Sequence, residues 1–168
     1  KVLITGESGV GKDLVARYLH SQSPRKAGPF VAVNCAGLTE TLLESELFGH
    51  VKGSFTGAFR DKRGKIQLAH HGTLFLDEVG EMSLRMQALL LRFLENGEIQ
   101  AVGSDSARTT VEVRVLAAVR QDPLDIRVVG QAQLEPVGQE PRRRPAHVVI
   151  VAMTASPSGT ASAPPGRK

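Results

Sequence analysis

Short apolar runs alternate with longer segments in which apolar residues recur at helical spacing, and this alternation covers residues 1–122. Four runs are predicted as strands buried in a parallel sheet, at residues 1–5, 30–34, 73–77 and 112–119. Three amphipathic segments are predicted as helices, at residues 12–21, 38–47 and 83–96. Strands that alternate with helices along a chain are typical of an α/β fold with helices flanking a parallel sheet.

The third predicted helix is apolar on a broad face, which we interpret as core and sheet packing. The residues on that face are Leu84, Met86, Leu89, Leu90, Leu91, Phe93 and Leu94. Asn96 and Gly97 supply its C-terminal stop. The stretch 97–104 is predicted to form a hairpin connection, with Ile99, Ala101 and Val102 partly buried.

A glycine-rich stretch, GESGVGK, lies directly between the first predicted strand and the first predicted helix. Its glycines let the backbone curl without Cβ clashes, so that successive N–H groups point at a polyanion. The helix start adds its positive dipole end, and a lysine ammonium can reach the outer phosphates. A glycine-rich turn with a chance lysine is the alternative, and the flanking strand and helix disfavour it. We therefore predict a nucleoside triphosphate site formed by Gly6, Glu7, Ser8, Gly9, Val10, Gly11 and Lys12.

Asp13 follows the lysine at a position where serine or threonine commonly ligates Mg²⁺. A carboxylate at this position can still hold the metal through water, although it also brings negative charge near the phosphates. The loop alone therefore supports triphosphate binding more firmly than it supports a particular chemistry.

The apolar run Thr73–Leu76 ends in two acids, Asp77 and Glu78. On a strand neighbouring the phosphate loop, Asp77 would orient Mg²⁺ and its waters. Glu78 would polarise the water that attacks the γ-phosphate. Both acids being merely solvated at a strand end is the alternative, which the accompanying phosphate loop disfavours.

Four segments in this order carry a family resemblance: GESGVGKDLVAR, FVAVNCAGL, ESELFGHVKGSFTGA and GTLFLDEVGEM. Together they resemble the central AAA+ domain of the bacterial sigma-54-dependent transcriptional activators, also called enhancer-binding proteins. The most specific segment, at residues 53–58, is similar to that family's GAFTGA loop with serine in place of the first alanine. The resemblance covers residues 1–122, which we expect to form a partial AAA+ sigma-54 interaction domain of the P-loop NTPase class.

The resemblance implies an ATPase that uses ATP and Mg²⁺. Asp77 and Asp13 would hold the metal, the latter through water, and Glu78 would activate water. Asn34 matches an asparagine that restrains the catalytic glutamate until the remodelling target engages.

In the family, ATP hydrolysis in a ring, usually a hexamer, moves the GAFTGA loop and remodels the closed complex of the sigma-54 RNA polymerase holoenzyme. The matching partner-binding residues here are Gly53, Ser54, Phe55, Thr56, Gly57 and Ala58, with Phe55 and Thr56 at the tip. The residues alone also allow Phe55 to pack inward, with the glycines merely forming turns. DNA binding is expected from a separate domain.

The chain departs from the family pattern near its end. Arg120 stands where the family has an asparagine that senses the γ-phosphate, and no match continues beyond Pro123. Residues 123–168 are rich in proline, glycine and arginine, and we expect disorder there. Within them, the run 148–153 is predicted to be an edge strand or an aggregation-prone segment. Since the family's arginines that reach a neighbouring ATP are not matched, weak ATP binding and very slow hydrolysis are expected.

Two alternative functions remain open: a non-catalytic nucleotide-binding relic, and another P-loop AAA+ machine.

The 168 residues suit one domain of ordinary size, and the single cysteine, Cys35, suits a reducing cytoplasm. No apolar run is long enough to span a bilayer. Residues 1–122 hold 15 basic and 14 acidic residues, so the net charge of +4 belongs mainly to the tail. Because Lys1 falls in the first predicted strand, we expect the gene product to begin upstream.

Overall fold

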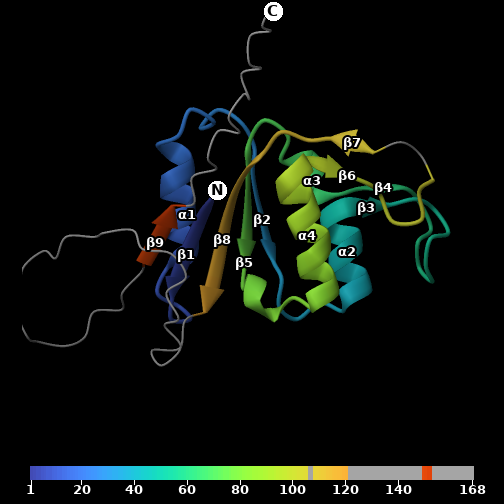
Figure 1. Cartoon of the computed structure of the whole chain (residues 1–168), viewed down its shortest axis with the longest axis horizontal. Coiled ribbons are helices and arrows are strands. Elements are labelled where there is room, and N and C mark those ends of the chain that lie inside the picture. Colours follow the sequence, from blue (N-terminus) through green and yellow to red (C-terminus); the bar gives the residue numbers. More distant parts are fainter. Residues whose placement is uncertain (106–107, 121–148, 153–168) are drawn as a thin grey trace, which may run out of the picture.

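The computed structural model describes residues 1–105, 108–120 and 149–152. Its centre is a five-stranded sheet with the order β2-β5-β8-β1-β9 (Figure 1). Four of its strands run parallel, which confirms the predicted parallel sheet. The strands are β1 (Val2–Gly6), β2 (Phe30–Asn34), β5 (Thr73–Asp77), β8 (Arg114–Arg120) and β9 (Val149–Ala152).

Helices cover both faces of this sheet. They are α1 (Lys12–Ser21), α2 (Glu40–Phe48), α3 (Lys65–Leu68), α4 (Leu84–Asn96) and the 3₁₀ turn η1 (Val79–Glu81). Successive residues of a strand point to opposite faces. Accordingly, Phe75 packs in one apolar cluster with Ala16 of α1, whereas Leu74 and Leu76 pack in another with residues of α2 and α4. The result is a three-layer arrangement with the sheet in the middle.

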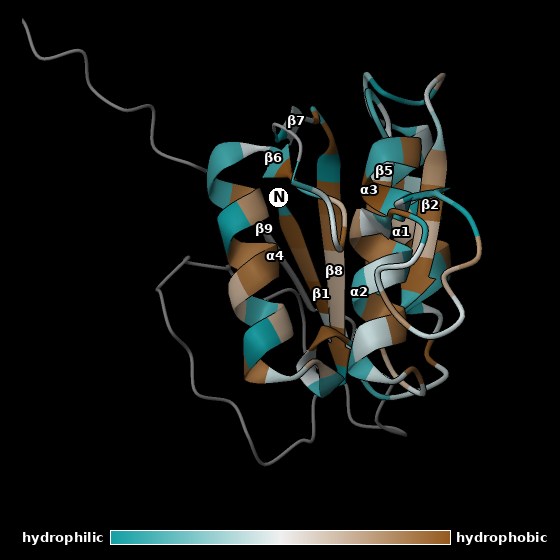
Figure 2. Cartoon of the chain, turned by 90° about the vertical axis from the view of Figure 1, so that its right-hand side faces the viewer, coloured by the Kyte–Doolittle hydropathy of each residue, from teal (hydrophilic) through white to brown (hydrophobic). Residues whose placement is uncertain are grey.

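Helix α4 has well-defined ends. The Ser83 hydroxyl accepts a hydrogen bond from the Met86 N–H at 3.2 Å, and Gly97 ends the helix with a φ of 71°. Figure 2 shows hydrophobic and hydrophilic bands alternating along it, as expected of an amphipathic helix. The predicted broad core face is partly wrong, because Leu84 and Leu91 are exposed. The apolar side of α4 is wider than the part of a helix surface that one face of a sheet can cover.

Two small antiparallel ladders lie at the end of the molecule away from α1 (Figure 1). One pairs β3 (Gly49–His50) with β4 (Lys62–Arg63), and the other pairs β6 (Glu98–Ile99) with β7 (Thr109–Thr110). The second ladder shows that a hairpin follows α4, although its second strand lies beyond the predicted stretch 97–104 and Ile99 is buried rather than partly buried. A bridge between His50 and Val102 brings the two ladders together.

Strand β9 pairs antiparallel with β1 at the edge of the sheet. The edge-strand interpretation of the run 148–153 is therefore confirmed for residues 149–152. The predicted disorder of the rest of 123–168 lies outside the described residues. Within the described part of the chain, no helix has the length and apolar character that crossing a membrane requires.

Candidate nucleotide-binding site

The phosphate loop connects β1 to α1. Gly9 and Gly11 have φ values of 80° and 87°, in the left-handed region that favours glycine. A Cβ added at Gly9 would meet no atom within 4 Å, so the loop is open on that side. Helix α1 begins directly afterwards, at Lys12, and presents its free N–H groups to the loop. The backbone therefore has the curl and the donors that a polyphosphate requires.

Lys12 is buried beneath this loop, with only 7% of its surface exposed. Its ammonium donates to the carbonyl oxygens of Gly6 at 3.0 Å and Glu7 at 2.8 Å. A buried cation needs such partners because its desolvation is costly. The charge is thus held inside the loop, next to the backbone donors.

Asp13 lies in the first turn of α1 and is exposed. A carboxylate in this turn interacts favourably with the positive end of the helix dipole. Glu7 and Ser8 are exposed in the loop itself, whereas Val10 is half-buried. All the residues predicted to bind phosphate therefore belong to one continuous loop and helix start.

Asp77 and Glu78 follow the buried part of β5 and are both half-buried. An Asp77 carboxylate oxygen accepts a hydrogen bond from the Glu78 N–H at 3.0 Å. Glu78 has a φ of 55°, which is unusual for a residue other than glycine. Backbone strain of this kind is concentrated at functional sites. The backbone therefore turns at Glu78, directly after Asp77, instead of continuing as an extended strand.

The strand order corrects one expectation: the acids do not lie on the immediate neighbour of β1. Strand β8 is inserted between β1 and β5, which places these two strands about 10 Å apart. Gly6 is in register with Arg120 at the end of β8. Because the strands are parallel, the loop and the acids still share the carboxyl edge of the sheet, where α/β proteins bind ligands.

Asn34 ends β2 in register with Asp77. Its side-chain oxygen accepts a hydrogen bond from the Ala36 N–H at 2.7 Å. Among the described residues, the structure gives no hydrogen bond between Asn34 and Glu78. Asn34 is thus brought to the same edge as the acids, while its predicted restraint of Glu78 stays a prediction.

Cys35 lies against the acidic pair, and its N–H donates to the Asp77 carbonyl oxygen at 2.9 Å. Burial, followed by the charges of Asp77 and Glu78, raises the pKa of the Cys35 thiol to about 12. The thiol is 3% exposed and stays protonated at neutral pH. In this environment Cys35 acts as a small buried hydrophobe.

The Gly53–Ala58 loop lies between β3 and β4, far from the phosphate loop in Figure 1. The Gly53 N–H donates to the Ala58 carbonyl oxygen at 2.8 Å, which closes the loop at its base. Gly53 and Gly57 have φ values of 82° and 103°. This hydrogen bond and the two glycine conformations define a compact turn, in which Thr56 is exposed.

Phe55 is half-buried in this loop. Its ring meets the buried His50 ring edge to face, with 5.0 Å between centroids. The His50 Nδ1 is in turn 2.7 Å from the Ser45 hydroxyl. At the loop base, Ser54 packs against Gly103 so closely that a Cβ added there would lie 2.5 Å from the Ser54 Cβ. In this conformation Phe55 therefore packs inward, which is the alternative that the sequence left open.

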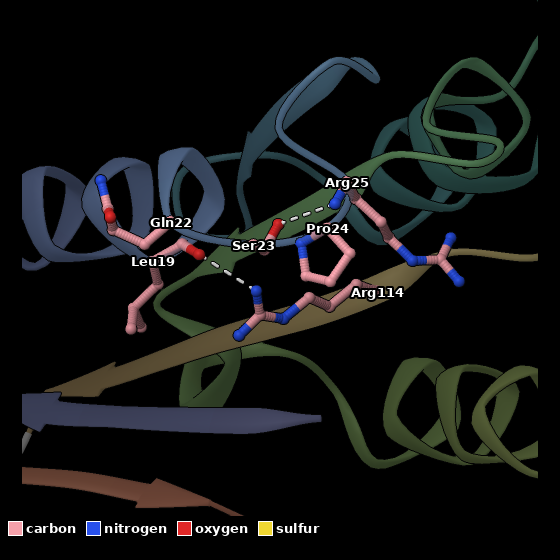
Figure 3. Close-up of a pocket in the computed structure, with 6 residues that line it drawn as sticks. All are labelled: Leu19, Gln22, Ser23, Pro24, Arg25 and Arg114. Atoms are coloured by element: carbon pink, nitrogen blue, oxygen red, sulfur yellow. Dashed lines mark hydrogen bonds between the residues drawn. The ribbon is translucent and has the colours of Figure 1, made fainter.

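A separate cavity of about 330 Å³ lies at the opposite edge of the sheet, where β8 begins (Figure 3). Arg114 crosses it and donates to the Leu19 carbonyl oxygen at 3.0 Å. Leu19 and the residues that follow α1 form its other wall. None of the predicted phosphate-binding or acidic residues lines this cavity, so it is not part of the nucleotide site.

A parallel sheet with a glycine-rich phosphate loop after one strand and paired acids after another defines the class: a P-loop nucleotide-binding fold of the AAA+ type. The profile of the sigma-54 interaction domain family matches residues 1–131, so the similarity extends beyond Pro123, which corrects the expectation that no match continues there. The chain belongs to this family.

Two relatives show the extent of the similarity. The anaerobic nitric oxide reductase transcription regulator NorR of Klebsiella pneumoniae (strain 342) is 59% identical over 121 residues, which are 72% of this chain and 23% of that protein. NorR of Escherichia coli O1:K1 / APEC is 58% identical over 121 residues, 72% of this chain and 24% of that protein. The chain thus spans about a quarter of the length of these relatives.

Solved structures of NtrX from Brucella abortus share the fold. One superimposes with a TM-score of 0.64 at 42% identity and covers 72% of this chain and 26% of NtrX. The NtrX complex with ATP gives a TM-score of 0.62 at 42% identity, covering 71% of this chain and 26% of NtrX.

Proposed function

We propose that this domain binds and hydrolyses ATP to drive remodelling of the sigma-54 RNA polymerase closed complex in a transcription regulator. One observation carries the nucleotide part: buried Lys12 in its glycine loop and the Asp77–Glu78 pair share one edge of the sheet. The family membership supports the sigma-54 part. The relatives are transcription regulators, and one structural neighbour is a complex with ATP.

The site residues fit a magnesium-bound triphosphate. The open side of the loop at Gly9 and the N–H groups of α1 can accept phosphate oxygens, while Lys12 supplies a positive charge. Asp77 would hold Mg²⁺, with Asp13 acting through water. Bound Mg²⁺ neutralises charge on the transferred phosphoryl group. Mg²⁺ at nucleotide sites is typically held by one or two carboxylates together with substrate phosphates and water.

Glu78 is proposed to accept a proton from the attacking water, and Asn34 to position Glu78. The Gly53–Ala58 loop would contact sigma-54, with exposed Thr56 at the surface and Phe55 released from His50 on engagement. We further propose a homo-oligomeric ring, usually a hexamer in this family, and DNA binding by a separate domain. Such a module would act in the cytoplasm, beside RNA polymerase.

Equilibrium binding of a fluorescent ATP analogue tests the nucleotide site. Lys12→Ala should abolish binding because it removes the buried positive charge from the loop. Lys26→Ala is the matched control, since Lys26 is exposed in the loop between α1 and β2. Unchanged affinity in Lys12→Ala would contradict the proposed site.

An ATPase assay over a protein concentration series separates the proposal from a non-catalytic relic. Ring assembly makes the specific activity rise steeply with concentration. A relic shows binding without turnover at every concentration.

A further inference from the structure

The connection between β3 and β4 carries a strongly exposed aromatic side chain. Phe59 is 84% exposed, whereas Phe55 in the same connection packs against His50. The hydrogen bond between Gly53 and Ala58 closes the loop immediately before Phe59. Phe59 therefore follows the closed turn and has no core to enter, so its ring remains in water at a hydrophobic cost.

Basic residues are close to this aromatic in the sequence. Residues 52–65 contain five basic side chains and a single acid, Asp61. The Asp61 carboxylate already accepts the Lys52 N–H at 2.7 Å, and the Lys62 ammonium pairs with Glu46. Arg60 and Arg63 are exposed, and within the described residues neither forms an ion pair. Two arginines with uncommitted charge thus follow the exposed ring within four residues of the chain.

We propose that Phe59, Arg60 and Arg63 form a docking surface for an acidic polypeptide segment of sigma-54 that also carries an apolar side chain. The inference rests on the proposed function and extends the contact beyond the Gly53–Ala58 loop. Aromatic and arginine side chains are enriched among the residues that dominate protein interfaces. The uncommitted positive charge selects an acidic partner, and the exposed ring selects an apolar anchor within it.

The position of this surface suits a first contact. It adjoins the Gly53–Ala58 loop in the chain, and the connection between β3 and β4 lies at the end of the molecule away from β1 and α1 (Figure 1). The half-buried Phe55 offers less surface in this conformation than Phe59, which is largely exposed. Phe59 would thus engage the partner before Phe55 leaves His50.

Binding of purified sigma-54 to the full chain, measured with a non-hydrolysable ATP analogue present, tests the surface. Phe59→Ala should weaken binding at least tenfold, a loss of about 1.4 kcal/mol, and Phe59→Leu should weaken it less. Arg60→Glu combined with Arg63→Glu should slow association and flatten its salt dependence. Leu84→Ala is the matched apolar control, because Leu84 on α4 is also 84% exposed. Lys26→Glu is the charge control.

The outcomes separate this inference from the proposed function. If the unaltered chain and Thr56→Ala both fail to bind sigma-54, the proposed function and the docking surface are both wrong. If the unaltered chain binds, Thr56→Ala is impaired and Phe59→Ala binds normally, only the docking surface is wrong. The docking surface alone is also wrong if the variant with both Arg60→Glu and Arg63→Glu loses affinity for duplex DNA but binds sigma-54 normally. Thermal melts should be unchanged by these exposed substitutions.

Discussion

Gly6 and Arg120 lie opposite each other in the register of the parallel strands β1 and β8, at the carboxyl end of each. Strand β8 also runs beside β5. Arg120 therefore ends the strand that separates the phosphate loop from the Asp77–Glu78 pair. Its side chain is exposed at this edge, where the resemblance implies an asparagine instead.

Arg120→Ala should weaken ATP binding more than ADP binding. With ATP bound, an exposed guanidinium at this edge would attract the additional negative charge of the third phosphate by about 1 kcal/mol, or roughly a fivefold change in Kd. Competition binding with the two nucleotides measures the difference. Arg92→Ala, at an exposed position of α4, should change neither affinity. An equal loss for ATP and ADP would show that Arg120 does not distinguish them.

Glu78→Gln should retain nucleotide binding and lose hydrolysis by roughly 100-fold or more. The amide keeps the size and hydrogen-bonding capacity of the side chain but cannot accept a proton from water. Steady-state ATPase measurements alongside equilibrium binding separate the two effects. Hydrolysis at the unaltered rate would remove Glu78 from its proposed role.

Glu78→Gly should stabilise the fold while it abolishes hydrolysis. Glu78 has a φ of 55°, and glycine adopts this conformation without the strain of about 1 kcal/mol that a Cβ imposes. Urea unfolding measures the gain. His71, with a φ of 58°, offers a comparison site two residues before β5, where substitution by glycine should leave nucleotide binding unchanged. A destabilised Glu78→Gly variant would indicate that lost side-chain contacts and the greater freedom of glycine in the unfolded chain outweigh the strain.

Cys35 should make the stability depend on alkaline pH. Its folded pKa is raised to about 12 from the ordinary value of 9.0, so the unfolded thiol loses its proton first. The free energy of unfolding should therefore fall as pH rises from 9 to 12, and Cys35→Ala should lack this component. Iodoacetamide at pH 8 offers an independent check. It should modify the native protein far more slowly than the urea-unfolded chain.

Leu116→Ala should destabilise the protein by about 2–5 kcal/mol, because it leaves a cavity in the middle of the sheet. Leu116 lies on β8 and is 0% exposed. Leu91→Ala is the control: Leu91 is 56% exposed on α4, and its truncation should cost less than about 0.5 kcal/mol. Chemical denaturation compares the two. Similar losses of unfolding free energy in the two variants would mean that the side of α4 that carries Leu91 is covered in solution.

Much of the fold was predictable because its signals are local. The phosphate loop, the acidic strand end and the bounds of β2, β5 and α1 follow from glycine placement and apolar periodicity within short windows. The insertion of β8 between β1 and β5 was not predictable in this way. Strand order depends on which crossover buries the most apolar surface, and no local pattern records that choice.

The loop at residues 53–58 also has some features that the sequence predicts and others that only the folded chain determines. Its glycines already indicated a tight turn, and its similarity to the GAFTGA loop indicated a partner contact. The exposure of Phe59, rather than of Phe55, came only from the folded chain, in which His50 lies where it can receive the Phe55 ring. Residue identity and spacing thus specified the chemistry: a lysine in a glycine loop and two acids after a strand. Folding specified the neighbours, since burial and register depend on segments distant along the chain.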